Sequence, residues 1–432
     1  MLTLRPKFLL AAAFLTTTAA QLSAASFFPT SPLIQIGQDT DIFFTANATL
    51  NITDNLYSST TKTSATSYTV TPGFALEYAK DSPLYATASI SRSQIRYAGI
   101  SRLNNSQDVL DGAVFIDLGG PLKFTLHSNY RESARNDNLT SLGIDGNEIG
   151  ETLVRQGDYQ HSLKLDYRLT EKISIGATFT NSYNRYLNPV TIVDPADTNP
   201  IVADRNRIYN TNSLNEINTK NIVLTATYNP PRDLITYGLN YSHALNDFSP
   251  APYLSTNNDP HTQDIYKSTQ DNLSFTASGS LTRSGKLGLS GSLGAVSSTT
   301  FSRVAAESKS TDLSYSLSLK HQLTESLNHS IDLGRYVSPT PSGINSKTTT
   351  YGYSISCAAA EKATFSFNVS RADTTVGETK IVSLNYGAMA TYQMNQHLNF
   401  TANLSLADTK FPANSATNFQ AKGFILSADF RY

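Results

Sequence analysis

The chain has 432 residues, of which 39% are hydrophobic and 16% are charged, and its formal net charge is −1. Because the sequence contains no block of Lys and Arg, nucleic acid is not expected as a partner. The single cysteine, Cys357, excludes an intramolecular disulfide and a cysteine metal site. The remaining residues, rich in Ser, Thr, Asn and Gly, suit a wall with one apolar and one polar face.

The amino terminus has the features of a secretory signal peptide. Arg5 and Lys7 precede an apolar run over residues 8–20, which is too short for a spanning helix. Ser23 and Ala25 predict cleavage before Ser26, and cleavage after residue 20 is a second possibility. The predicted organisation is a signal peptide over 1–25, a short periplasmic segment over 26–38 and a barrel over 39–432. No other stretch approaches eighteen consecutive apolar residues.

Apolar and polar residues alternate through most of the mature chain, and this period of two is typical of strands with two different faces. In chain order, the predicted strands are 39–52, 68–78, 84–97, 108–118, 122–131, 158–169, 172–186, 217–229, 234–245, 270–283, 287–299, 312–322, 327–337, 349–357, 363–373, 380–393, 398–408 and 419–432. The last strand ends in the aromatic residues Phe430 and Tyr432, which resemble the signal read by barrel-assembly machinery. It is expected to pair with strand 39–52, with Phe430 facing lipid.

The connections between these strands are alternately short and mostly longer. The short ones are 80–83, 119–121, 170–171, 230–233, 284–286, 323–326, 358–362 and 394–397, while the others include 132–157, 187–216, 246–269 and 374–379. An edge strand of a soluble β-sandwich also fits the closing stretch, but a sandwich gives no reason to place short turns at one end. Outer-membrane barrels do, with short periplasmic turns and long outer loops. We therefore predict an all-β, transmembrane antiparallel barrel of about eighteen strands, with sixteen as an alternative.

The polar face of the strands is expected to line a water-filled lumen, because a barrel of this width is not filled by side chains. By strand parity, the candidate lumen-lining charges are Glu77, Lys123, Arg131, Lys164, Asp166, Arg168, Lys320, Asp332, Asp429 and Arg431. Their signs nearly cancel, so they predict no charge selectivity. The loop 187–216 is expected to be an ordinary exposed loop, and the alternatives are an inward constriction or a cation site formed by its aspartates.

No catalytic, cofactor or metal motif is present, and the chain is not expected to be an enzyme. The seven histidines are scattered, and the sequence lacks HExxH, GxSxG, a P-loop and GxGxxG. His127 and His161 lie on neighbouring predicted strands among many serines, but such coincidences are expected in a serine-rich chain.

The stretch Tyr68–Tyr78, YTVTPGFALEY, together with the preceding Thr53–Tyr57, TDNLY, resembles the start of the beta-barrel porin 2 family of outer-membrane porins. The resemblance implies passive diffusion of small hydrophilic solutes across the outer membrane of a diderm bacterium. It also implies a possible role in exopolysaccharide export. A surface adhesion or structural barrel with a plugged lumen is a further alternative, and the oligomeric state is open.

Overall fold

The computed structural model describes residues 32–135 apart from 57, 59, 61, 81 and 118, and then 154–187, 215–230, 234–250, 265–302, 306–339 and 345–432 apart from 414. The predicted signal peptide, 1–25, therefore lies outside the described residues, as do residues 188–214 of the long loop predicted over 187–216. No helix in the described ranges is long and apolar enough to cross a membrane.

The alternating segments form long strands, and the described residues also include the short 3₁₀ helices η1 (Ser101–Leu103), between β4 and β5, and η3 (Ser415–Thr417), between β18 and β19. The strands are β1 (Ile34–Ile36), β2 (Thr40–Thr53), β3 (Ala65–Tyr78), β4 (Leu84–Tyr97), β5 (Asn105–Asp117), β6 (Leu122–Arg135), β7 (Val154–Arg168), β8 (Ile173–Tyr186), β9 (Asn215–Tyr228), β10 (Ile235–Pro250), β11 (Ile265–Ser280), β12 (Leu287–Ser302), β13 (Ser308–Gln322), β14 (Leu327–Pro339), β15 (Asn345–Ala360), β16 (Ala363–Val376), β17 (Thr379–Gln393), β18 (Leu398–Lys410) and β19 (Phe419–Arg431).

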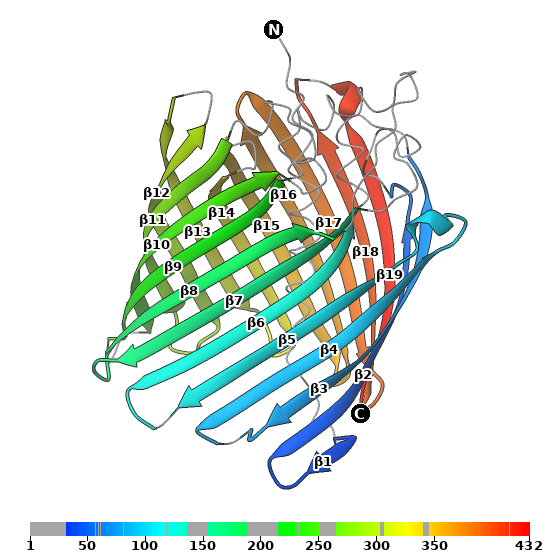
Figure 1. Cartoon of the computed structure of the whole chain (residues 1–432), viewed down its shortest axis with the longest axis horizontal. Coiled ribbons are helices and arrows are strands. Elements are labelled where there is room, and N and C mark those ends of the chain that lie inside the picture. Colours follow the sequence, from blue (N-terminus) through cyan, green and yellow to red (C-terminus); the bar gives the residue numbers. More distant parts are fainter. Residues whose placement is uncertain are drawn as a thin grey trace.

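The strands β2 to β19 form a closed antiparallel barrel in which each strand pairs with its sequence neighbours (Figure 1). The ring closes between β19 and β2, where Phe430 pairs with Ala46 and Leu426 with Leu50. This confirms the predicted fold class, the count of eighteen wall strands and the pairing of the closing strand. The short β1, within the predicted segment 26–38, forms a hairpin with β2 through the pair Ile34 and Ile42.

The strands extend further on the side of the longer connections than the sequence predicted. The clearest case is residues 374–379, predicted as a loop. Here β16 and β17 stay paired up to Val376 and Thr379, so only a two-residue turn remains. Gly377 occupies this turn with φ of 56°, a left-handed conformation that glycine adopts without a steric penalty. The loop prediction was wrong because strand pairing continues beyond the apolar alternation.

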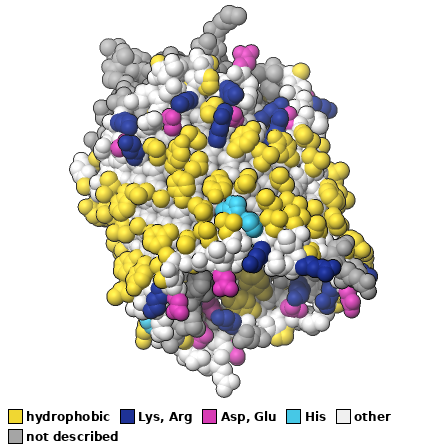
Figure 2. Space-filling view, turned by 180° about the vertical axis from the view of Figure 1, so that it is seen from behind, with side chains coloured by type: hydrophobic (Ala, Val, Ile, Leu, Met, Phe, Trp, Pro, Cys, Tyr) yellow, Lys and Arg dark blue, Asp and Glu magenta, His cyan; other side chains and the backbone are white. Residues whose placement is uncertain are grey.

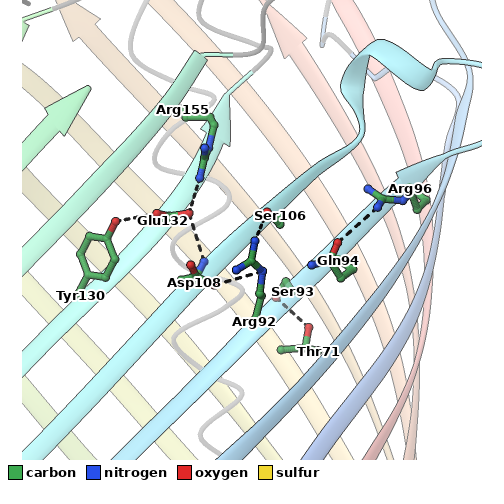
Figure 3. A network of polar contacts seen from close by, with 10 residues as sticks. All are labelled: Thr71, Arg92, Ser93, Gln94, Arg96, Ser106, Asp108, Tyr130, Glu132 and Arg155. Carbon is green, nitrogen blue, oxygen red and sulfur yellow. Dashed lines mark hydrogen bonds and ion pairs between the residues drawn. The ribbon is translucent and has the colours of Figure 1, made fainter. Parts of the chain in front are cut away.

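The Pro72-Gly73 pair interrupts the ladder between β3 and β4. Pairing runs to Val70 and Gln94 and resumes at Gly73 and Ser91, since proline has no N–H to donate. A Cβ atom on residue 73 would lie 2.7 Å from the Ile90 carbonyl oxygen, so the close approach of the strands requires glycine. The hydroxyls of Thr71 and Ser93, 2.8 Å apart, bridge the interruption (Figure 3).

A second irregularity separates β13 from β14. Their ladder has eight pairs, from Gln322 and Asn328 to Tyr315 and Arg335, and stops there. Beyond this point β13 continues to pair with β12 as far as Ser308, while β14 continues to pair with β15 as far as Pro339. The wall therefore parts between β13 and β14 on the side of the longer connections.

Candidate channel lumen

The outward face of the barrel is apolar over a broad band, because alternate positions on each strand carry large hydrophobic side chains. On β3 these are Tyr68, Val70 and Phe74, each more than half exposed. Figure 2 shows the band crossing the molecule, with Lys, Arg, Asp and Glu side chains concentrated above and below it. An apolar belt between two charged zones is the surface expected of a barrel that spans a bilayer.

The inward face carries hydroxyl and amide groups that bridge neighbouring strands. These bridges are Thr49 Oγ1–Ser427 Oγ (3.1 Å), Ser292 Oγ–Ser316 Oγ (2.7 Å), Ser330 Oγ–Ser354 Oγ (2.8 Å) and Asn47 Nδ2–Asp429 Oδ1 (2.7 Å). They provide polar partners on a wall whose other side is apolar, so the inner surface suits contact with water.

Strand register places all ten charges predicted from parity at positions that alternate with the outward apolar residues. Three of them, Lys123, Lys164 and Asp166, have side chains 43–59% exposed. The structure brings four of these ten residues together as two ion pairs: Lys164 with Asp166 (2.8 Å), and Arg431 with Glu77 (2.6 Å). Lys123 instead pairs with Asp117, which had not been singled out. The remaining five are Arg131, Arg168, Lys320, Asp332 and Asp429; Asp332 accepts a hydrogen bond from Ser330 and Asp429 from Asn47.

The Arg431–Glu77 pair spans the closure of the barrel. Arg431 is on β19 and Glu77 is on β3, so the ion pair crosses β2, which lies between them. The guanidinium carbon of Arg431 also lies 4.0 Å from the ring centroid of the buried Phe43. This arrangement fastens three strands on the inner face where the two ends of the sheet meet.

Sequence reasoning missed two other inward clusters on neighbouring strands. Tyr85 and Phe115 stack with centroids 5.4 Å apart, and Phe115 is 38% exposed. Nearby, Asp111 accepts hydrogen bonds from Asn129 (3.0 Å) and lies 2.8 Å from His127 Nε2. The parity pattern does place these residues inward, but only charged residues were selected as lumen candidates and His127 was considered only for catalysis.

The parts of β14 and β15 around Val337 and Lys347 lie on the lumen side of the neighbouring strands. Gln270 Nε2 on β11 donates to the Val337 carbonyl oxygen on β14 (3.1 Å), although β12 and β13 separate these strands in the ladder. Two side chains of β15 reach over β14 to β13: Asn345 bonds to Ser310, and Lys347 forms an ion pair with Asp312 (2.5 Å). Such contacts between non-neighbouring strands require the hairpin to lie against the inner face of β11–β13, where it narrows the lumen.

The outer boundary of the apolar band is marked by aromatic and charged side chains. Tyr130, Tyr159 and Tyr183 form a row on β6–β8 with centroids 4.6 and 6.4 Å apart. Directly beyond it, the Glu132 carboxylate accepts hydrogen bonds from Tyr130 (2.8 Å) and Arg155 (2.7 Å) (Figure 3). A row of tyrosines against charges is the pattern of a membrane–water interface. Among the described residues, no group of three or more His, Cys, Asp or Glu side chains is arranged to hold a metal ion.

Comparisons with known proteins support the fold. No family model and no curated protein matches the sequence. Solved structures do match: OccK2 (OpdF) from Pseudomonas aeruginosa, in complex with glucuronate, aligns with a TM-score of 0.50 at 10% identity, covering 91% of this chain and 98% of that one. The FrpB iron transporter from Neisseria meningitidis aligns with a TM-score of 0.51 at 12% identity, but this chain spans only 63% of its length. The fold thus resembles outer-membrane barrels of Gram-negative bacteria.

Proposed function

We propose that the protein is an outer-membrane channel for passive diffusion of small hydrophilic solutes, with no catalytic step. The observation that carries this proposal is a closed eighteen-strand wall with an apolar outer belt and a polar inner face. Strands about 4.8 Å apart and tilted by about 40° give a backbone diameter of about 36 Å. This is far wider than the eight-stranded barrels that side chains fill, so water is expected inside.

The small acid glucuronate is a sensible first solute to test, because it is the ligand in the OccK2 structure with the same fold. The proposed partners are outer-membrane lipid, the solutes themselves and barrel-assembly machinery that reads the carboxy-terminal strand. Phe430 supports the last role, since its ring lies 6.4 Å from that of Phe44 on β2 at the closing seam. Tyr432 continues the seam through backbone hydrogen bonds with Phe44 in both directions (2.6 and 2.9 Å).

Single-channel recording in planar bilayers tests the proposal. The refolded protein should produce discrete conductance steps, and external glucuronate should reduce the ionic current. The double change Lys123→Glu and Lys164→Glu on the inner face should shift permeability toward cations. A matched change at the outward Lys309, 72% exposed at the rim, should not. Absence of conductance from correctly folded protein would refute the channel and favour a plugged barrel.

A further inference from the structure

The parting between β13 and β14 begins at the height of the apolar belt. The paired section has eight residues, and at about 3.4 Å per residue and a tilt of about 40° it rises about 21 Å from the turn side. The apolar band of an outer-membrane barrel is about 25 Å tall. With the first pair, Gln322 and Asn328, placed at the inner edge of this band, the two strands separate a few ångströms below its outer edge, and not only in the loops above it.

The parted strands overlap: beyond the last β13–β14 pair, β14 and β15 lie on the inner side of β13, and this overlap is called the joint below. On β15, Asn345 and Lys347 have the same parity as Tyr351 and Tyr353, which are exposed outward, so regular strand geometry would place Asn345 and Lys347 on the outer face. They instead contact Ser310 and Asp312 on the inner face of β13. The outer side of the hairpin thus lies on the inner side of the adjoining wall, and three side-chain contacts close the joint.

The two sides of this joint differ in chemistry. Outside, Leu313 on β13, two residues beyond the last pair with β14, is 52% exposed. Inside, the joint is lined by polar groups, including the Asp312 carboxylate, whose side chain is 9% exposed. At the point of parting lies Arg335, whose buried Nε has no hydrogen-bond partner in the described part of the chain. A path with an apolar outer lip, a polar interior and a cation at its vertex suits an amphipathic acid.

We propose that the joint between β13 and β14 is a lateral passage by which an amphipathic acid moves between the lumen and the outer leaflet of the membrane. The Lys347–Asp312 ion pair holds it shut, and separation of the hairpin from β13 opens it. This inference rests on the proposed membrane location of the barrel, but it adds a second route and a second class of solute to the diffusion pathway.

The hydrogen-bonding needs of the unpaired backbone groups explain why a hairpin covers the joint. Unpaired strand edges at membrane depth are tolerated only where protein or water satisfies their polar groups. Gln270 does so for the Val337 carbonyl group, which lies on β14 beyond its last pair with β13. When the joint is closed, protein groups satisfy the backbone N–H and C=O groups of the strand edges. When it is open, these groups are exposed to the water of the lumen.

Reversible disulfides test the passage. In a Cys357→Ala background, Ser310→Cys with Asn345→Cys locks the joint, because the two native side chains are in hydrogen-bond contact. The matched control is Thr348→Cys with Thr374→Cys, whose hydroxyls lie 3.0 Å apart on the already paired β15 and β16. The probe is dansyl-undecanoic acid, and the readout is its initial rate of accumulation in porin-depleted diderm cells. Planar-bilayer conductance is measured on the same proteins.

Oxidation of the joint pair should lower probe uptake by about fivefold or more, with recovery after reduction, because it removes the open population. The control pair should show no redox dependence. Lys347→Ala should raise uptake by about fivefold, the shift expected on losing a partly exposed ion pair. Equal uptake by the oxidised and reduced joint variant, or an equal fall in the control, would overturn the proposal. A protein without conductance whose probe uptake still depends on the redox state of the joint would refute the diffusion channel and leave the lateral passage standing, because conductance and uptake are measured separately.

Discussion

Replacing Arg431 with Met should destabilise the closure of the barrel by about 2 kcal/mol. A hydrogen bond to a charged group contributes about 1.5–3 kcal/mol, and the contact with the Phe43 ring about 1 kcal/mol more. Lys80 remains 3.6 Å from Glu77 and offsets part of the loss. The side chains of Arg431 and Glu77 are only 24% and 18% exposed, so water replaces the interaction poorly.

Urea unfolding of the protein refolded in lipid vesicles, followed by the mobility of unheated samples on gels, measures this loss. Arg371→Met is the control. Arg371 makes two hydrogen bonds to Asp373 on its own strand but is 52% exposed, so water replaces these bonds and its loss should cost much less than the loss of Arg431. A double-mutant cycle with Glu77→Gln should give a coupling above about 1 kcal/mol. Equal losses for the two arginine variants, or no coupling, would refute the idea that this pair fastens the seam.

Two further predictions concern the ladder and acid sensitivity. Gly279→Val should abolish refolding, because a Cβ atom would overlap the Leu234 carbonyl oxygen. Gly112→Ala should refold normally, because its Cβ atom would have no neighbour nearer than 3.6 Å. The mobility of unheated samples on gels checks both variants. Burial raises the pKa of Asp54, but hydrogen bonds from Lys62 and the Lys422 amide outweigh it and hold the pKa below 3.8. The stabilisation is therefore full above pH 3.8 and is lost as the pH falls through the lowered pKa. The hydrogen-exchange rate of the Lys422 amide, relative to that of an unprotected amide at the same pH, should rise there, and Asp54→Asn should remove this transition.

Sequence alternation was sufficient to predict the barrel and the two-faced character of its strands. A shift of one residue would move every side chain to the other face, so parity alone places Lys164 and Asp166 inward. The closing pair of Phe430 with the first strand followed from the even number of strands. These features depend on local periodicity and on the order of the strands, and both can be determined from the sequence.

Other features depend on how neighbouring strands are displaced, which periodicity does not record. Parity predicts an outward Lys347, but the infolding of the hairpin carries it to Asp312 on the inner face. The stacked Tyr85 and Phe115 were also missed, because a wide lumen tolerates large apolar groups that a filled core would exclude. Nothing in the local pattern marks where the β13–β14 ladder stops at Tyr315.

The hydroxyl bridges on the inner wall affect the basis on which the channel would discriminate between permeating molecules. In the pair Ser292–Ser316, each hydroxyl already has a protein partner and still offers a lone pair to the lumen. A solute that sheds part of its hydration shell meets fixed dipoles of zero net charge. Over such stretches, discrimination should depend on molecular cross-section and change little with ionic strength, because salt screens charges far more than it screens neutral hydrogen-bonding groups.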